Sequence, residues 1–339
     1  MNKIQAQDVK NFVSSFSLSE ELFNATFLIT GATGLIGSTL INCLLALNKG
    51  IEIIAPVRNK AKAENLFGYS NCIKIIECDI VTYDYESLGE VDYVIHCAAP
   101  TSSKFFVESP VETSRTIYEG TCALLEYARK MPVKSFVYLS SLEVYGSICD
   151  DSVYVTEEVQ GDLEIMGVRS SYPMAKRATE NLCCLYCSEY GVPVKVARLT
   201  QTTGAGISED DNRIIAQFAR LAAEGKDIVL HTSGESARPY CYLTDAVSAI
   251  LYILLKGKSA EAYNVANEDT YISAKDMAYY LANHFNPSIS VLIHLDNTMG
   301  YAPVTKLRLS AQKLRELGWK PKYGLKEIFT KLIDSLNEC

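Results

Sequence analysis

Long hydrophobic runs and blocks of basic residues are both missing from this sequence. The longest strongly apolar stretch, residues 246–255, has about half of the ~20 residues that a membrane-spanning helix needs. The opening segment MNKIQAQDVKNF contains no apolar core of the kind found in secretory signals. Lys and Arg total 32 against 40 Asp and Glu, and the net charge of −8 argues against nucleic acid as the main partner. We therefore expect a cytoplasmic protein that binds neither membranes nor nucleic acid.

The cysteines form neither a disulfide framework nor a metal-binding pattern. There are 11 of them, an odd number, and most lie inside apolar runs, as Cys97 does in VIHCAAP. This pattern indicates reduced thiols that pack as small hydrophobic groups. Cys183, Cys184 and Cys187 include one CxxC pair, but no second pair or nearby His completes a metal site. We predict no bound metal.

Residues 26–200 alternate between strand and helix patterns. The runs TFLIT, IEIIAPV and DYVIHCAA have continuous rather than alternating apolar character, which is typical of parallel strands covered on both faces. The alternation predicts an α/β fold with a doubly wound parallel sheet of Rossmann type. After residue 200 the segments shorten and turn residues become frequent. We divide the chain approximately into a helical extension (1–24), a dinucleotide-binding domain (25–200) and a smaller, partly interleaved C-terminal α/β substrate lobe (201–339).

A glycine-rich turn, TGATGLIG at residues 30–37, follows the first strand and opens a helix. Gly31 permits the tight turn, Gly34 lets the backbone approach a pyrophosphate, and Gly37 lets helix and strand pack closely. The N–H groups and positive dipole end of the helix then face the phosphates. This context predicts a dinucleotide site. Its contact residues are Gly31, Thr33, Gly34, Leu35, Ile36 and Gly37.

The end of the second strand bears on the choice between NAD and NADP. An acidic residue there would bind the ribose 2′-hydroxyl. Val57 occupies that position, Arg58 follows, and Glu52 lies too early in the strand. A guanidinium without a competing carboxylate favours a 2′-phosphate, so NADP is slightly favoured over NAD. The alternative is that Arg58 is a solvated loop charge.

Tyr172 and Lys176 lie four residues apart in a helical pattern and therefore share one face. An ammonium beside a phenol lowers the pKa of the phenol, which can then exchange a proton with a sugar hydroxyl during hydride transfer. The same spacing occurs at Tyr252–Lys256 and Tyr271–Lys275. We select Tyr172 because it follows a strand that ends in Ser140–Ser141, after the dinucleotide motif.

The motifs TGATGLIG, HCAAPTS, YLSSLEVYG, SYPMAK and RPYCYLTD occur in an order that resembles the extended short-chain dehydrogenase/reductases. Within them the chain is similar to the nucleotide-sugar epimerase/dehydratase branch over roughly residues 24–335. The resemblance implies that Ser141 binds the reacting sugar oxygen, that Tyr172 is the acid/base, and that Lys176 also binds the nicotinamide ribose. It assigns adenine and cofactor contacts to Asp79, Ile80, Ala98 and Ala99, and substrate contacts to Gln201, Arg213, Arg238 and Arg308.

Two positions depart from the pattern that the resemblance implies. Sugar 4,6-dehydratases of this branch carry an Asp–Glu pair after the catalytic Ser/Thr, and here those positions are Leu142 and Glu143. Leucine cannot donate a proton, which disfavours 4,6-dehydration. Glu143 is retained, and the resulting S-x-E pattern resembles the UDP-glucuronate decarboxylases. In this chain Glu143 is either a base near C5 or a hydrogen-bonded residue at the end of the strand. The usual Asn of the central helix is Ile117, which removes a supporting hydrogen bond.

The leading expectation is an epimerase that forms a transient keto-sugar on a nucleotide-activated sugar. A UDP-glucuronate-decarboxylase-like enzyme is the close alternative. An NADPH-dependent reductase of a sugar or sugar phosphate for surface polysaccharide precursors is a second enzyme class, and a non-catalytic dinucleotide sensor is disfavoured by the intact Ser141, Tyr172 and Lys176. The resemblance also implies a homodimer through helices 109–130 and 171–190. The apolar side chains expected there are those of Leu124, Leu125, Leu182 and Leu185.

Overall fold

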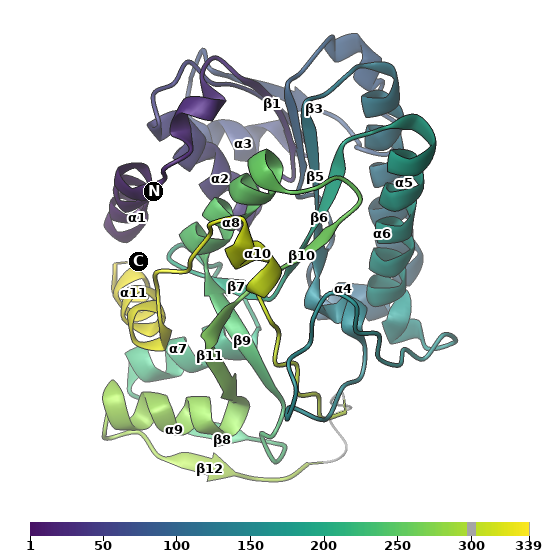
Figure 1. Ribbon diagram of the computed structural model, residues 1–339. Helices are drawn as coiled ribbons and strands as arrows, with labels where there is room; N and C mark the ends of the chain where they lie inside the picture. The colour runs from purple at the N-terminus through teal and green to yellow at the C-terminus, as the bar shows by residue number, and fades with distance from the viewer. Residues whose placement is uncertain (297–302, 339) are drawn as a thin grey trace.

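The computed structural model describes residues 1–296 and 303–338, and a seven-stranded sheet forms its centre (Figure 1). The strand order is β10-β6-β5-β4-β1-β2-β3, and every neighbouring pair is parallel. The predicted α/β fold with a doubly wound sheet is therefore confirmed. The strands of this sheet are β1 (Thr26–Thr30), β2 (Glu52–Val57), β3 (Ile73–Glu77), β4 (Tyr93–His96), β5 (Ser135–Ser141), β6 (Val194–Leu199) and β10 (Ala262–Val265).

Helices cover both faces of the sheet, as its continuously apolar strands require. In β1, Phe27 and Ile29 pack in one buried cluster with α2 and α8, whereas Leu28 packs in another with α5 and α6. In Figure 1, α5 and α6 run side by side along the face opposite α2 and α8. The helices of this part are α1 (Lys3–Ser15), α2 (Leu35–Ala46), α3 (Lys60–Phe67), α4 (Ser103–Glu108), α5 (Pro110–Lys130), α6 (Ser171–Tyr190) and α8 (Leu243–Lys256), with the 3-10 turns η1 (Ser19–Leu22), η2 (Tyr85–Leu88), η3 (Leu142–Tyr145) and η4 (Val168–Ser170).

The C-terminal part forms a smaller lobe below the large sheet in Figure 1, with two short sheets of order β11-β9-β7 and β12-β8. The two parts interleave, because the chain returns from this lobe through α8 to β10, which pairs with β6 at the edge of the large sheet. The elements of the lobe are β7 (Gln201–Thr203), α7 (Ile214–Glu224), β8 (Ile228–Leu230), β9 (Ala237–Tyr242), β11 (Asn267–Ser273), α9 (Ala274–His284), β12 (Val291–Ile293) and α11 (Leu325–Asn337). The short helix α10 (Gln312–Glu316) packs instead against α8 and β10.

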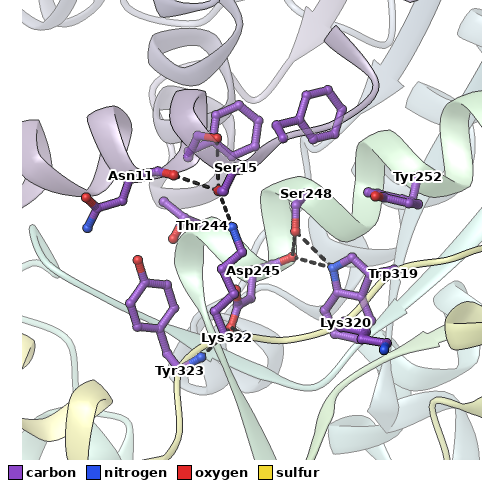
Figure 2. A pocket seen from close by; sticks show the side chains of 12 residues that line it. Asn11, Ser15, Thr244, Asp245, Ser248, Tyr252, Trp319, Lys320, Lys322 and Tyr323 are labelled. Atoms are coloured by element: carbon purple, nitrogen blue, oxygen red, sulfur yellow. Dashed lines mark hydrogen bonds between the residues drawn. The ribbon is translucent and has the colours of Figure 1, made fainter.

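The first helix, α1, is anchored to the C-terminal segment. Asp8 accepts hydrogen bonds from Tyr242 and Lys331, so its buried carboxylate is paired. A cavity of about 50 Å³ lies between α1, α8 and residues 319–323, and Figure 2 shows its polar lining. No helix in the described part of the chain is long and apolar enough to cross a bilayer.

Candidate functional site

The glycine turn lies where the strand order of the large sheet reverses, between β1 and β4. Gly31 has φ +68°, and a Cβ atom built on it would lie 2.8 Å from the backbone nitrogen of Ala98, just after β4. The turn and the Ala98–Ala99 segment therefore meet at the carboxyl ends of two adjacent parallel strands. In open α/β sheets this switch point is where ligands bind.

The turn fits a dinucleotide. A Cβ on Gly37 would lie 2.3 Å from the carbonyl oxygen of Gly31, so only glycine permits this approach of α2 to the turn. Gly34 is exposed, and a Cβ there would meet only the Gly31 oxygen, at 3.3 Å. Gly34 is also the N-cap of α2, and no side chain caps the helix. The N–H groups at the start of α2 are thus available to a phosphate, and the phosphate contacts of Leu35 and Ile36 stay predictions.

The ends of β2 and β3 provide the predicted adenine side of the site. Arg58 is exposed directly after β2, and no interaction of its guanidinium is found among the described residues. Asp79 follows β3 and accepts a hydrogen bond from the Val81 N–H at 2.8 Å. Ile80 is buried against α5, where a Cβ on Gly120 would meet its Cδ1 atom at 2.8 Å. The roles of these residues toward a cofactor stay predictions.

The catalytic candidates converge from two elements. Ser141 ends β5, and its hydroxyl caps η3 by accepting a hydrogen bond from the Glu143 N–H at 3.2 Å. Tyr172 lies in the first turn of α6; burial raises the pKa of its phenol, and the Ser141 side chain acts in the opposite direction. The charge of Glu143 also acts on this phenol and raises its pKa. Ser141, Glu143 and Tyr172 are therefore neighbours.

Lys176 lies one turn after Tyr172 and is 3 % exposed. Its Nζ donates to the Leu139 carbonyl oxygen at 2.6 Å and lies 5.7 Å from the centroid of the Tyr172 ring. The same Nζ is 4.6 Å from the centroid of the Tyr138 ring. Burial lowers the pKa of Lys176 to about 7.

The expectation of a lowered phenol pKa is wrong for this structure, because burial of Tyr172 raises its pKa instead. The Lys176 ammonium is directed to a strand carbonyl, so it does not offset this desolvation. Tyr172 packs in an apolar cluster with Phe106, Ile117 and Ala175, with Ala99 against it. The rings of Phe106 and Tyr172 stack at 4.3 Å with an interplanar angle of 11°.

Sequence reasoning missed Phe106. The ring lies in α4, a six-residue helix, and nothing in its local pattern points to a tyrosine 66 positions later. Ile117, in contrast, was recognisable as a departure from the family pattern. Ile117 belongs to the apolar cluster that contains Tyr172, so an apolar side chain replaces the amide that the resemblance implies at this position.

The other two Tyr–Lys pairs are used elsewhere. Lys256 forms an ion pair with Glu21 at 2.7 Å, and the Tyr252 hydroxyl bonds to Ser17. The Tyr271 hydroxyl donates to Asp151 at 2.9 Å. The structural context of Tyr172 therefore separates it from both alternatives.

The candidate substrate residues lie on neighbouring segments of the smaller lobe. Gln201 in β7 pairs with Tyr240 in β9, two residues after Arg238. Arg213 donates to the Thr202 carbonyl oxygen at 2.6 Å, and both it and Arg238 act on the pKa of Tyr240. The segment with Arg308 runs beside the start of β9, where Lys306 bridges to Ala237. The structure thus gathers these residues around β9.

The three arginines differ in their partners. Arg213 forms a bidentate ion pair with Asp211, with contacts of 2.6 to 3.1 Å. Arg238 has one long hydrogen bond, 3.4 Å to the Thr305 hydroxyl, and Arg308 lies over the Tyr154 ring at 4.4 Å. Neither forms an ion pair within residues 1–296 and 303–338. A cavity of about 360 Å³, lined by residues including Ala237, Ile272 and Lys306, opens on this side.

Two further features concern the centre of the sheet. His96 is buried between the hydroxyls of Thr30 and Thr121, at 2.6 and 3.0 Å, and burial lowers its pKa to about 3. It is therefore a neutral bridge between β1 and α5. Among residues 1–296 and 303–338, no group of three or more His, Cys, Asp or Glu side chains is placed to hold a metal ion.

Comparisons with known proteins show the family to which the chain belongs. The NAD dependent epimerase/dehydratase family model matches residues 27–266. UDP-glucuronic acid decarboxylase 3 of Arabidopsis thaliana is 29 % identical over 307 residues, which are 90 % of this chain and 86 % of that protein. UDP-glucuronic acid decarboxylase 5 of the same plant is also 29 % identical over 307 residues, 90 % of this chain and 87 % of its own.

Solved structures share the fold. UDP-glucose 4-epimerase of Thermotoga maritima, with UDP-glucose, has a TM-score of 0.79 at 24 % identity and covers 92 % of this chain and 99 % of its own. UDP-glucuronic acid 4-epimerase of Bacillus cereus, with UDP-glucuronic acid and NAD, has a TM-score of 0.78 at 20 % identity, with the same coverage. The matched family segment contains the glycine turn, Ser141, Tyr172 and Lys176, and the chain belongs to the NAD-dependent epimerase/dehydratase family.

Proposed function

We propose that this enzyme decarboxylates a UDP-linked uronic acid through a keto-sugar. The observation that carries the proposal is Glu143, an exposed carboxylate in the turn after Ser141 whose charge acts on Tyr172. No ion pair of Glu143 is found in the described part of the chain. The similarity over most of the chain to UDP-glucuronic acid decarboxylases supports this substrate.

The residues divide the proposed chemistry among them. The glycine turn at residues 30–37 and Lys176 would hold NAD, which would supply a reversible hydride acceptor next to the sugar. The Tyr172 phenolate removes the proton of the sugar hydroxyl, with Ser141 hydrogen-bonded to the same oxygen. A keto group next to the carbon that carries the carboxylate accepts the electron pair when CO₂ leaves. After CO₂ has left, the exposed Glu143 passes a proton from solvent to that carbon. Arg238 and Arg308 bind the diphosphate through charge-assisted hydrogen bonds.

An epimerase is the second candidate, favoured by Leu142. This side chain is 4 % exposed and apolar beside Ser141, where dehydration requires a proton donor. Oxidation followed by hydride return to the other face of the sugar needs only Ser141, Tyr172 and Lys176. The two proposals share their first step and differ in the fate of the carboxylate.

The test is product analysis after incubation of the purified protein with NAD and UDP-glucuronic acid. Release of one CO₂ per sugar with formation of a UDP-pentose is the expected result. Formation of the C4 epimer with the carboxylate retained would replace decarboxylation by epimerisation. Stoichiometric consumption of NADPH with a sugar or sugar phosphate would favour the reductase instead.

The cofactor preference has its own test. The family is NAD-dependent, and the comparisons give no support to a preference for NADP. The exposed Arg58 and the apolar Val57 leave room for a 2′-phosphate at the end of β2. We expect Arg58→Glu to weaken NADPH binding about tenfold more than NADH binding, from the loss of a phosphate contact. Equal weakening, measured by the fluorescence of the bound cofactors, would make Arg58 a solvated charge.

The homodimer through α5 and α6 stays a proposal, but different side chains must form its interface. Leu124 and Leu125 are fully buried inside the subunit, so they are not available to a partner, contrary to the sequence expectation. Tyr118 on α5 and Leu185 on α6 are 41 % and 52 % exposed and remain suitable. Light scattering of Leu185→Asp should show a monomer if α5 and α6 form the interface.

A further inference from the structure

A buried ion pair joins the helix of Tyr172 to the central sheet. Glu180 lies one turn after Lys176 on α6, and Arg198 lies in β6. The guanidinium holds the carboxylate at both oxygens, with Nε at 3.1 Å from each and Nη2 at 2.7 Å from Oε2. The two side chains are 15 % and 11 % exposed. A fork of this kind fixes orientation as well as distance.

The remaining nitrogen of Arg198 reaches the turn that follows β5. Its Nη1 donates to the Tyr145 hydroxyl at 3.0 Å and to the Glu157 carbonyl oxygen at 2.7 Å. Tyr145 is fully buried and donates in turn to the Asn264 side chain at 2.7 Å. Tyr145 closes η3, the turn that begins after Ser141 and contains Glu143.

A second arginine, which lies in α6 itself, also bonds to the turn that follows β5. Arg177 donates through Nε to the Val144 carbonyl oxygen and through Nη2 to the Gly161 carbonyl oxygen, both at 2.6 Å. Val144 and Tyr145 follow Glu143 in the turn, and both are bonded to arginines. Arg177 belongs to α6, and Arg198 is paired with Glu180 of α6.

We propose that Glu180 and Arg198 are positioning residues that lock the Ser141–Glu143 turn against the helix carrying Tyr172 and Lys176. The proposal rests on the roles given above to those four residues. Arg198 connects the two halves because it bonds Glu180 on one side and Tyr145 on the other. Without this connection, the turn is held against α6 by Arg177 and by packing.

Electrostatics supports the same pair. Burial lowers the pKa of Lys176, and the charge of Glu180 is the first influence that opposes it. The other groups facing Lys176 are Cys183 on α6, Tyr138 on β5, His96 and Cys97 at the end of β4, and Tyr172 itself. None of these is an anion at neutral pH, since burial raises the pKa of both thiols and of both phenols. Glu180 is thus the carboxylate whose charge opposes the lowering of the Lys176 pKa.

The experiment uses Glu180→Gln, Arg198→Lys and a matched control, Asp8→Asn. Asp8 pairs with Lys331 between α1 and α11, in a comparably buried ion pair outside the catalytic elements. Breaking either pair should lower the melting temperature. The readouts are kcat and KM with UDP-glucuronic acid, the pH profile of kcat, NADH affinity against pH, and amide exchange in residues 142–146.

Glu180→Gln and Arg198→Lys should each lower kcat roughly 10- to 100-fold with KM nearly unchanged, since a small misplacement of catalytic groups costs this much. Exchange in residues 142–146 should rise in both. In Glu180→Gln the alkaline decline of kcat and of NADH affinity should move to lower pH, because Lys176 loses its proton earlier. Asp8→Asn should lose stability without these changes.

The proposal is overturned if Asp8→Asn behaves like the other two variants, or if these keep the wild-type pH profile and exchange rates. If the wild-type protein does not turn over UDP-glucuronic acid, the proposed function fails by itself. Amide exchange and the pH dependence of NADH binding then still test whether Glu180 and Arg198 position the turn.

Discussion

The two sides of the site are built differently. On the cofactor side, one continuous segment from β1 into α2 forms the turn, and its shape depends on glycines that touch backbone atoms. On the substrate side, the candidates are side chains from β7, β9 and two loops. A backbone-built site is insensitive to rotamers, whereas a site built from arginines depends on what else each guanidinium binds. The first kind suits a cofactor shared by many enzymes, and the second allows the substrate to change.

The largest effect is expected where the two sides meet, at Tyr172. Tyr172→Phe removes the hydroxyl while keeping the stack on Phe106, so hydride transfer should fall about 1000-fold with NAD affinity unchanged. Single-turnover absorbance of bound NADH measures it. A rate within tenfold of the wild type would remove Tyr172 from the chemistry.

The arginines allow a sharper comparison within the substrate side. Arg238→Gln removes a guanidinium that has no carboxylate partner among the described residues, so sugar-nucleotide affinity should fall about 30-fold with little change in melting temperature. Arg213→Gln leaves Asp211 half-buried without its partner, so it should mainly lower the melting temperature. Calorimetry of UDP binding and thermal unfolding measure both. The reverse outcome would exchange the two roles.

The backbone construction of the cofactor side is tested at two glycines. Gly37→Ala places a methyl group 2.3 Å from the Gly31 oxygen, which forces α2 away from the turn. NADH affinity should fall about tenfold. Gly34→Ala meets the same oxygen at 3.3 Å and should cost less. A larger loss of NADH affinity in Gly34→Ala than in Gly37→Ala would contradict this order. It would show that close approach of the phosphate to Gly34 matters more than the packing of α2 on the turn.

The smallest effect is a pH shift. Phe106→Leu should admit water to Tyr172 and lower its raised pKa, because desolvation is the main cause of the shift. Since the ionised phenol is the base, the acid limb of kcat should move about one pH unit lower. Phe105→Leu is the control, as that neighbouring ring is 37 % exposed. An unchanged profile, or one that moves upward, would show that the stack does not set this pKa.

The sequence predicted β1, β2 and β4 from the runs TFLIT, IEIIAPV and DYVIHCAA, because each is mostly apolar and lies between turns. It missed β10, whose four residues AYNV follow a long turn and gain strand character only by pairing with β6. The glycine turn and the Tyr172–Lys176 spacing were readable because they are local. Phe106, and the bond from Arg198 to Tyr145, join distant segments and leave no local pattern. Glu180 did leave a signal, because it lies one turn beyond Lys176.

The protein contains one tryptophan, Trp319, and that fact makes its intrinsic fluorescence unusually easy to interpret. The indole is 1 % exposed, and its N–H bonds to the Asp245 carbonyl oxygen and the Ser248 hydroxyl beside the small cavity under α1 (Figure 2). When the indole is excited selectively over the 21 tyrosines, every change in tryptophan emission traces to one location. A red shift during denaturation reports the release of the segment that carries Trp319, separately from absorbance signals at the dinucleotide turn. Fluorescence and absorbance together can therefore show whether the packing of α1 against residues 319–323 is lost before the catalytic centre unfolds or at the same time.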